Sequence, residues 1–199
     1  MDFKNHREHT LKYEPYLDRL SAIFRKMDER YDETAGKYGF VCTGCMESCC
    51  KTRFYHHTLI EYFYLKRGLE SLNSKDRMII HSKALEVKSQ WESPATPDPS
   101  GVMCPLNEAG RCRLYAHRPM ICRLHGIPHE LNHPTKGRAI GPGCHEFVIQ
   151  CGEKSYIPFD RTPLYQELAD LEKSFRQETG LGVKMKMTIA EMLAGSQNE

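Results

Sequence analysis

The sequence predicts a mainly α-helical protein whose helices pack around an irregular cysteine-rich core with at most a short β-hairpin. Apolar residues recur at helical spacing near both ends of the chain, and the middle holds all but one of the nine cysteines. A chain of 199 residues can bury roughly 70% of its unfolded surface as one domain. We therefore expect a single domain over residues 1–199, with a cysteine-cluster core at 40–150, an N-terminal helix at 14–35 and C-terminal helices at 162–195.

The first helix is predicted over residues 14–35. Pro15 suits the first turn of a helix, where its missing N–H group is not needed. Gly36 and Gly39 are expected to end the helix. One apolar stripe should face the core, and it consists of Tyr16, Leu17, Leu20, Phe24, Met27 and Tyr31.

Two further helices are predicted in the next segment. Thr58 and Glu61 form a capping-box pattern ahead of an apolar run, and Gly68 is expected to mark the far end of that helix. A third helix should begin near Ser74. Its core-facing stripe is expected to hold Met78, Leu85 and Trp91.

The centre of the chain is predicted to be irregular. Prolines make residues 93–101 a loop. The segment from Asn107 to Gly110 lies between Leu106 and Cys112 and is typical of a tight turn that joins two short extended pieces.

Regular structure is predicted again at the C-terminal end. Thr162 and Pro163 are typical of a helix start, and Gly180 is typical of a helix end. Thr188 and Glu191 form a last capping box, which should begin a short terminal helix. The stripe of the longer helix is Leu164, Leu168, Leu171 and Phe175.

Composition narrows the classes of partner. Lys and Arg total 28 against 26 Asp and Glu, so the net charge of +2 does not favour nucleic acid or a charged membrane surface. The first ten residues lack the apolar centre of a signal peptide, and no apolar run is long enough to span a membrane. We expect a cytoplasmic protein with a protein partner, without nucleic-acid or membrane binding.

The cysteines predict metal binding. In a reducing compartment, a cysteine-dense chain is more often metal-binding or catalytic than disulfide-bonded. Cys42, Cys45 and Cys49 would share one face if their segment were helical. The adjacent Cys50 points elsewhere in a helix or a strand, so the neighbouring pair is expected to serve two centres. A disulfide between the two neighbours is the alternative, and its geometry is restricted.

The remaining thiols are spread over a longer segment. Cys104, Cys112, Cys122 and Cys144 bring the total to eight, enough for two four-thiolate sites, and Cys151 is left over. Zinc and a cubane 4Fe–4S cluster both accept four cysteines. Zinc knuckles usually contain paired CxxC units, and only Cys42 and Cys45 form one here, which favours iron–sulfur clusters.

Charged and imidazole groups near the cysteines have two interpretations. Arg111, Arg113 and Arg123 could donate hydrogen bonds to sulfur and offset its charge, or could be solvated surface groups. The nearest histidines, His117, His125 and His145, are expected to lie outside the ligand set. An enzyme would need an acid, a base or an open metal position, and the groups to test for it are Glu47, His125 and His145.

Taken in order, these motifs resemble the YkgJ-type cysteine-cluster family (CxxCxxCC), described as zinc- or iron-chelating domains. The resemblance rests on the run from Cys42 to Cys50, the Cys104-Pro105-Leu106 step, Cys112-Arg113-Leu114-Tyr115, the segment from His117 to Arg123, and Gly143-Cys144. Three residues separate Cys45 from the cysteine pair, where the family motif often has two. The resemblance implies that the same eight cysteines are the metal ligands.

These observations support three functions. The first is an iron–sulfur protein with an electron-transfer or redox accessory role, in which eight cysteines hold the clusters. The second is a structural or interaction module that binds zinc through the same thiolates. The third is a metal-dependent oxidase or transferase.

Overall fold

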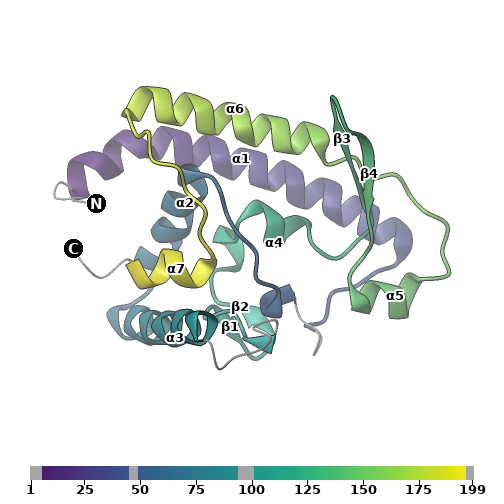
Figure 1. The fold of residues 1–199 in the computed structure, drawn as a ribbon, viewed down its shortest axis with the longest axis horizontal. Helices are drawn as coiled ribbons and strands as arrows, with labels where there is room; N and C mark the ends of the chain where they lie inside the picture. Colours follow the sequence, from purple (N-terminus) through teal and green to yellow (C-terminus); the bar gives the residue numbers. More distant parts are fainter. Residues whose placement is uncertain (1–5, 45–48, 94–100, 196–199) are drawn as a thin grey trace.

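A computed structural model describes residues 6–44, 49–93 and 101–195. Two long helices form its upper layer, α1 (His6–Tyr38) and α6 (Thr162–Thr179), which lie side by side and run in opposite directions (Figure 1). The other helices and both hairpins lie beneath them and at one end. The predicted mainly α-helical fold is therefore confirmed.

Helix α1 is longer than predicted at both ends. Pro15 lies inside it rather than in its first turn, so the expected helix start is wrong. A proline inside a helix removes one backbone hydrogen bond. Tertiary contacts offset this loss, because the Tyr13 ring, ahead of the proline, is buried against Phe63 and Phe175 at centroid distances of 4.6 and 5.2 Å.

Helix α2 (Leu59–Glu70) begins where expected but is capped differently. The Thr58 side chain makes no cap hydrogen bond, so the predicted capping box is wrong. The carboxylate of Glu172 on α6 instead accepts the N–H groups of Leu59 and Ile60, at 2.8 and 3.0 Å. Gly68 does not end the helix but lies within it, where an added Cβ would come within 2.4 Å of the His117 ring.

Helix α3 (Ser74–Glu92) buries a different face from the one predicted. Met78 and Leu85 are exposed, and the buried residues are Ile80, Ala84 and Val87. The terminal helix α7 (Ile189–Ala194) packs along α3 and selects this face. The capping box of Thr188 with Glu191 at the start of α7 is confirmed.

The segment between α3 and α6 consists of short elements. A hairpin of β1 and β2 surrounds the predicted turn, and a second hairpin, β3 and β4, was not predicted. The elements in chain order are β1 (Asn107–Glu108), β2 (Arg111–Cys112), η3 (Tyr115–His117), α4 (Met120–Leu124), β3 (His129–His133), β4 (Gly137–Gly141) and α5 (His145–Cys151). Ahead of them lies the 3-10 turn η1 (Cys49–Lys51). Helix α6 begins at Thr162 and ends before Gly180, as predicted, and Gly180 has the left-handed conformation. Helix α7 begins after Thr188, also as predicted.

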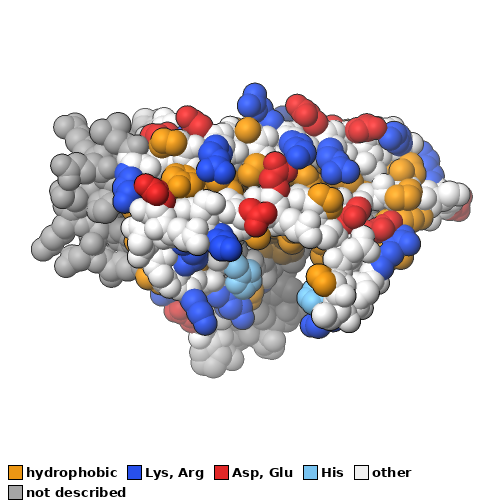
Figure 2. All heavy atoms as spheres, turned by 90° about the horizontal axis from the view of Figure 1, so that it is seen from above, with side chains coloured by type: hydrophobic (Ala, Val, Ile, Leu, Met, Phe, Trp, Pro, Cys, Tyr) orange, Lys and Arg blue, Asp and Glu red, His pale blue; other side chains and the backbone are white. Residues whose placement is uncertain are grey.

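The face formed by α1 and α6 carries acidic and basic side chains in alternation, not a patch of one sign (Figure 2). This matches the nearly balanced composition. None of the helices that the structure describes has the length and apolar character needed to cross a bilayer.

The C-terminal segment is joined to the start of α2 by two backbone hydrogen bonds between His56 and Met187. His56 is only 3% exposed, and burial lowers its pKa to about 4. Above pH 6.5 the imidazole is neutral in both the folded and the unfolded chain. Below that pH the unfolded chain takes up a proton that the folded chain does not, so stability is lost as the pH falls towards 4.

We therefore expect the free energy of unfolding to fall by up to about 3 kcal/mol through His56 between pH 6.5 and 4. Denaturant titrations at several pH values measure this effect. His56→Gln should have a shallower pH dependence than the wild type over this window. An equal slope in both proteins would show that His56 does not titrate as proposed.

Candidate metal centre

The short elements carry the cysteines towards one another. Cys49 and Cys50 lie in η1, Cys112 in β2, Cys122 in α4, and Cys144 at the N-cap of α5. All of these and Cys104 are partly buried, whereas Cys42 is exposed. Cys45 lies outside the described residues. The described parts of the segment from 42 to 50 are coil and a 3-10 turn, so the α-helical face considered for it is not formed there.

Four thiols form one mutually interacting group, which we call the first quartet: Cys50, Cys104, Cys112 and Cys122. The Cys104 N–H donates to the Cys50 carbonyl at 2.8 Å, which joins η1 to the segment before β1. Burial, together with the charges of Cys50 and Cys112, raises the pKa of Cys104 to about 12. Burial, followed by the charges of the other three thiols, also raises the pKa of Cys122 well above its usual value. A cation among these sulfurs would relieve that repulsion.

Backbone N–H groups point at several sulfurs. The Leu106 N–H donates to Cys104, and the Leu114 N–H donates to Cys112, and each bond lowers the pKa of the thiol. At the start of α5, the Phe147 N–H lies 3.4 Å from the Cys144 sulfur. Hydrogen bonds of this kind favour the thiolate, which is the form that binds metal.

A second group of thiols surrounds Tyr31 of α1. Burial raises the pKa of the Tyr31 phenol, and the charges of Cys42 and Cys144 raise it further. Cys42 also interacts with Cys49. The Cys144 N–H donates to the Gly126 carbonyl at 2.8 Å, which fixes this cysteine beside the segment after α4. Cys42 and Cys144 are thus the described members of this group, and Cys49 interacts both with Cys42 and with Cys50 and Cys122 of the first quartet.

The sulfurs are not yet arranged as ligands around one point. Among the described residues, no three His, Cys, Asp or Glu side chains are placed to hold a single ion. The thiols of Cys49 and Cys50 are close enough for a hydrogen bond, which raises the pKa of Cys49 together with burial. All the described cysteines are free, so the neighbouring pair forms no disulfide.

The donor set fits a soft or borderline metal. Thiolates are the ligands of zinc and of iron–sulfur clusters, and eight of them suffice for two closed centres. The described thiols fall into two neighbourhoods, with Cys49 and Cys50 at the boundary between them. That the adjacent pair serves two centres stays a prediction.

Two arginines place positive charge beside the first quartet. Arg123, only 4% exposed, pairs with Asp28 of α1 at 2.5 Å and donates to the carbonyls of Arg118 and Ala116. Arg118 also pairs with Asp28, at 3.2 Å. Burial raises the pKa of Cys112, and both guanidinium charges oppose this rise. Their described hydrogen bonds go to oxygen and not to sulfur, so their action on the thiols is through charge.

The other predicted arginines lie further out. Arg113 pairs with Asp76 and Glu108, both at 2.6 Å, at the surface between α3 and the first hairpin. Arg111 is exposed. For these two residues, the interpretation as solvated groups is the better one.

Glu61 is a buried acid that the sequence did not single out for the site. It is 4% exposed, and its Oε1 atom accepts the Met120 N–H at 2.7 Å, at the start of the short helix α4. Its Oε2 atom accepts the Thr58 hydroxyl at 2.5 Å. Burial raises the pKa of Glu61. Glu61 therefore links α2 to the helix that carries Cys122.

The histidines nearest the cysteines have other surroundings. His117 stacks on Tyr64 at a centroid distance of 4.9 Å, and His125 packs against Phe54 at 5.4 Å. His145 is exposed. Glu47, the remaining group considered for catalysis, lies outside the described residues. None of the described histidines belongs to a group of three potential metal ligands.

Gly126 lies between the second group of thiols and α1. Its φ is +126°, and an added Cβ would come within 2.4 Å of the Tyr31 hydroxyl. We expect Gly126→Ala to destabilise the protein by about 1–3 kcal/mol, because it adds backbone strain to a steric clash. Denaturant unfolding measures this. Gly182→Ala, in open space, is the matched control and should be close to neutral.

Cys151 is separate from both groups. It is 2% exposed, and its thiol donates to the Tyr38 carbonyl at 3.3 Å.

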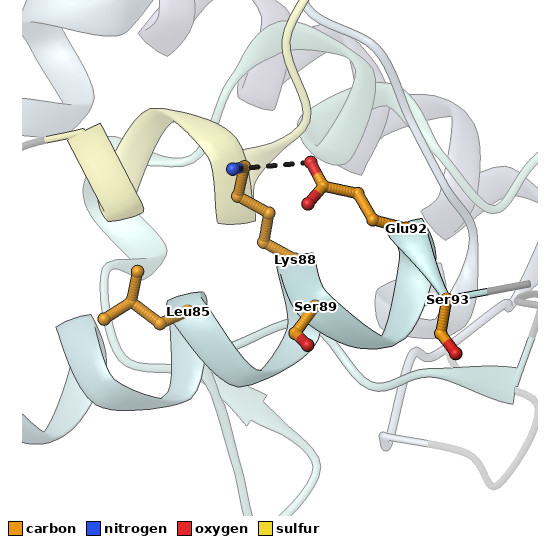
Figure 3. A pocket seen from close by; sticks show the side chains of 5 residues that line it. All are labelled: Leu85, Lys88, Ser89, Glu92 and Ser93. Atoms are coloured by element: carbon orange, nitrogen blue, oxygen red, sulfur yellow. Dashed lines mark ion pairs between the residues drawn. The ribbon is translucent and has the colours of Figure 1, made fainter.

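A shallow pocket on α3 offers no alternative metal site, because its five lining residues include no cysteine or histidine (Figure 3). They come from α3 and its C-cap, and Lys88 and Glu92 pair across it at 3.3 Å.

Comparison with a known family supports metal binding by this chain. Residues 41–139 match the family model described as "CxxCxxCC: Putative zinc- or iron-chelating domain". The match ends before Cys144, which the sequence resemblance had included. No curated protein and no solved structure matches the chain.

Proposed function

Because residues 41–139 belong to the CxxCxxCC family, we propose that this chain holds two four-thiolate metal centres. The first centre uses the first quartet, Cys50, Cys104, Cys112 and Cys122. The second uses Cys42, Cys45, Cys49 and Cys144. The observation that carries this proposal is that each thiol of the first quartet interacts with the other three.

We propose that the centres are iron–sulfur clusters with an electron-transfer or redox accessory role. Bound clusters would supply one-electron chemistry, and the chain itself would hold the thiolates and balance their charge. The exposed Cys42 and its 61% exposed neighbour Val41 put one end of the second group at the surface. A redox partner protein could approach there.

Metal analysis tests this assignment. The protein is purified without oxygen, and its iron, zinc and acid-labile sulfide are measured together with its visible absorption. Iron and sulfide in equal amounts, with sulfur-to-iron absorption bands, are the expected result. Zinc without sulfide, in a colourless protein, would contradict the iron–sulfur assignment.

Zinc is the second candidate, favoured by one observation. The hairpin β1–β2 carries Cys112 close to Cys104, and backbone N–H groups point at both sulfurs, an arrangement that also suits a closed zinc site. Such sites stabilise a domain directly, since the ligands do not converge in the unfolded chain. In that case the chain would act as an interaction module and not in electron transfer.

A further inference from the structure

Arg161 is a buried cation that forms no ion pair with an acid among the described residues. It is 2% exposed and lies at the N-cap of α6, beyond the residues that match the family. Among the described residues, the groups whose charges act most on it are phenols, those of Tyr165, Tyr31 and Tyr156. Burying an unpaired guanidinium is costly, so its position calls for an explanation.

The nearest acids along the chain are engaged elsewhere. Glu130, whose carbonyl accepts the Arg161 backbone N–H, directs its carboxylate to Arg138 and to the Tyr156 hydroxyl, both at 2.7 Å. Asp160 accepts hydrogen bonds from Asn132 and from the Thr162 N–H. Neither carboxylate is directed at Arg161.

The Arg161 guanidinium is instead hydrogen-bonded to the Tyr165 side chain and to the segment after α4, whose Gly126 carbonyl accepts the Cys144 N–H. One of its terminal nitrogens donates to the carbonyls of Leu124 and Ile127, the latter at 3.4 Å. The carbonyl of Gly126, next to Ile127, accepts the Cys144 N–H at 2.8 Å. The charge therefore lies one residue from the attachment point of a thiol of the second group. Its Nε atom is buried and has no hydrogen-bond partner.

We propose that Arg161 is the positioning residue and counter-charge of the second metal centre, and that the anion it balances is the metal–thiolate group formed with Cys144. A divalent metal with four thiolates carries a net charge of −2, and so does the usual oxidised 4Fe–4S cluster with its four cysteines. A buried cation near such a dianion stabilises it. This inference rests on the proposed function, because it requires that the second centre forms.

The histidine and phenol groups near Arg161 do not replace this anion. Burial and the charge of Arg161 lower the pKa of both His125 and His129, that of His129 to about 4. Burial raises the pKa values of Tyr31 and Tyr165. These groups are therefore neutral at pH 7, and the guanidinium keeps the only full charge among them.

Titration of the metal-free chain with Co²⁺ tests the inference, with thiolate-to-cobalt absorption as the signal for each bound ion. Arg161→Gln should weaken one of the two binding steps by at least about tenfold, and Arg161→Lys should retain most of the affinity. Arg176→Gln is the matched control on the same helix, because Arg176 pairs with Glu172 away from the cysteines. It should leave both steps unchanged.

Unfolding with and without Co²⁺ separates charge compensation from a purely structural role. If Arg161 compensates charge, Arg161→Gln should reduce the stability gained on Co²⁺ binding more than it reduces the stability of the metal-free chain. Equal losses in both states, with unchanged affinity, would overturn the inference. So would equal weakening in Arg161→Gln and Arg161→Lys. Absence of any cobalt signal in the wild type would instead overturn the proposed function.

Discussion

Replacing Cys122 by serine is expected to reduce the protein from two metal centres per chain to one. The charges of the other three thiols of the first quartet all contribute to the raised pKa of Cys122. Cys122 lies on α4, which contacts α2 through Glu61 and α1 through Asp28. A serine hydroxyl is a harder donor than a thiolate and is not ionised at pH 7. Quantitative metal analysis of the purified variant measures the loss.

Cys151→Ser is the control for this experiment. Cys151 is buried and its thiol donates to a backbone carbonyl, which a serine hydroxyl can also do. We expect the control to retain both centres. Equal metal loss in both variants, or none in Cys122→Ser, would contradict the assignment of the first quartet.

The second large effect is expected for Glu61→Ala. The change removes the acceptor of the Met120 N–H and of the Thr58 hydroxyl in a buried position. A buried donor without a partner costs about 1–3 kcal/mol, and the cavity left by the side chain adds to this. We expect a loss of about 3 kcal/mol in the free energy of unfolding, together with lower metal occupancy at the centre that contains Cys122.

Glu61→Gln distinguishes the hydrogen bonds from the charge. Glutamine keeps the shape and one acceptor oxygen for the Met120 N–H, and its amide nitrogen can donate to the Thr58 hydroxyl oxygen. This variant should stay within about 1 kcal/mol of the wild type and keep both centres. If Glu61→Ala were as stable as Glu61→Gln, the link between α2 and α4 would not depend on this side chain.

Local features could be predicted from the sequence. The capping box of Thr188 and Glu191, the helix end at Gly180 and the turn at Asn107 each depend on residues a few positions apart. Such features form wherever the local sequence favours them and nothing competes.

Features that depend on distant segments could not be predicted. Thr58 and Glu61 form the same pattern as Thr188 and Glu191, but Glu172 of α6 reaches the start of α2 and replaces the local cap. On α3 the buried face is chosen by α7, so periodicity alone selected Met78 and Leu85 wrongly. Propensity and pattern are overridden where tertiary contacts compete.

The candidate site divides in the same way. The sequence predicts that the cysteines bind metal. Which cysteines lie together depends on the contact of η1 with Cys104 and on the placement of Cys144 beside Gly126. Glu61 and Arg161 had no sequence signal, since charged residues are usually exposed and only the fold shows that these two are buried. A buried charge next to a cysteine cluster is the structural signal that identifies them.

Native mass spectrometry of protein purified without oxygen tests the central claim most directly. The account predicts a mass that exceeds the chain mass by two metal centres, either two 4Fe–4S clusters or two zinc ions. A mass equal to that of the metal-free chain, with the eight assigned cysteines available to a thiol reagent, would contradict it.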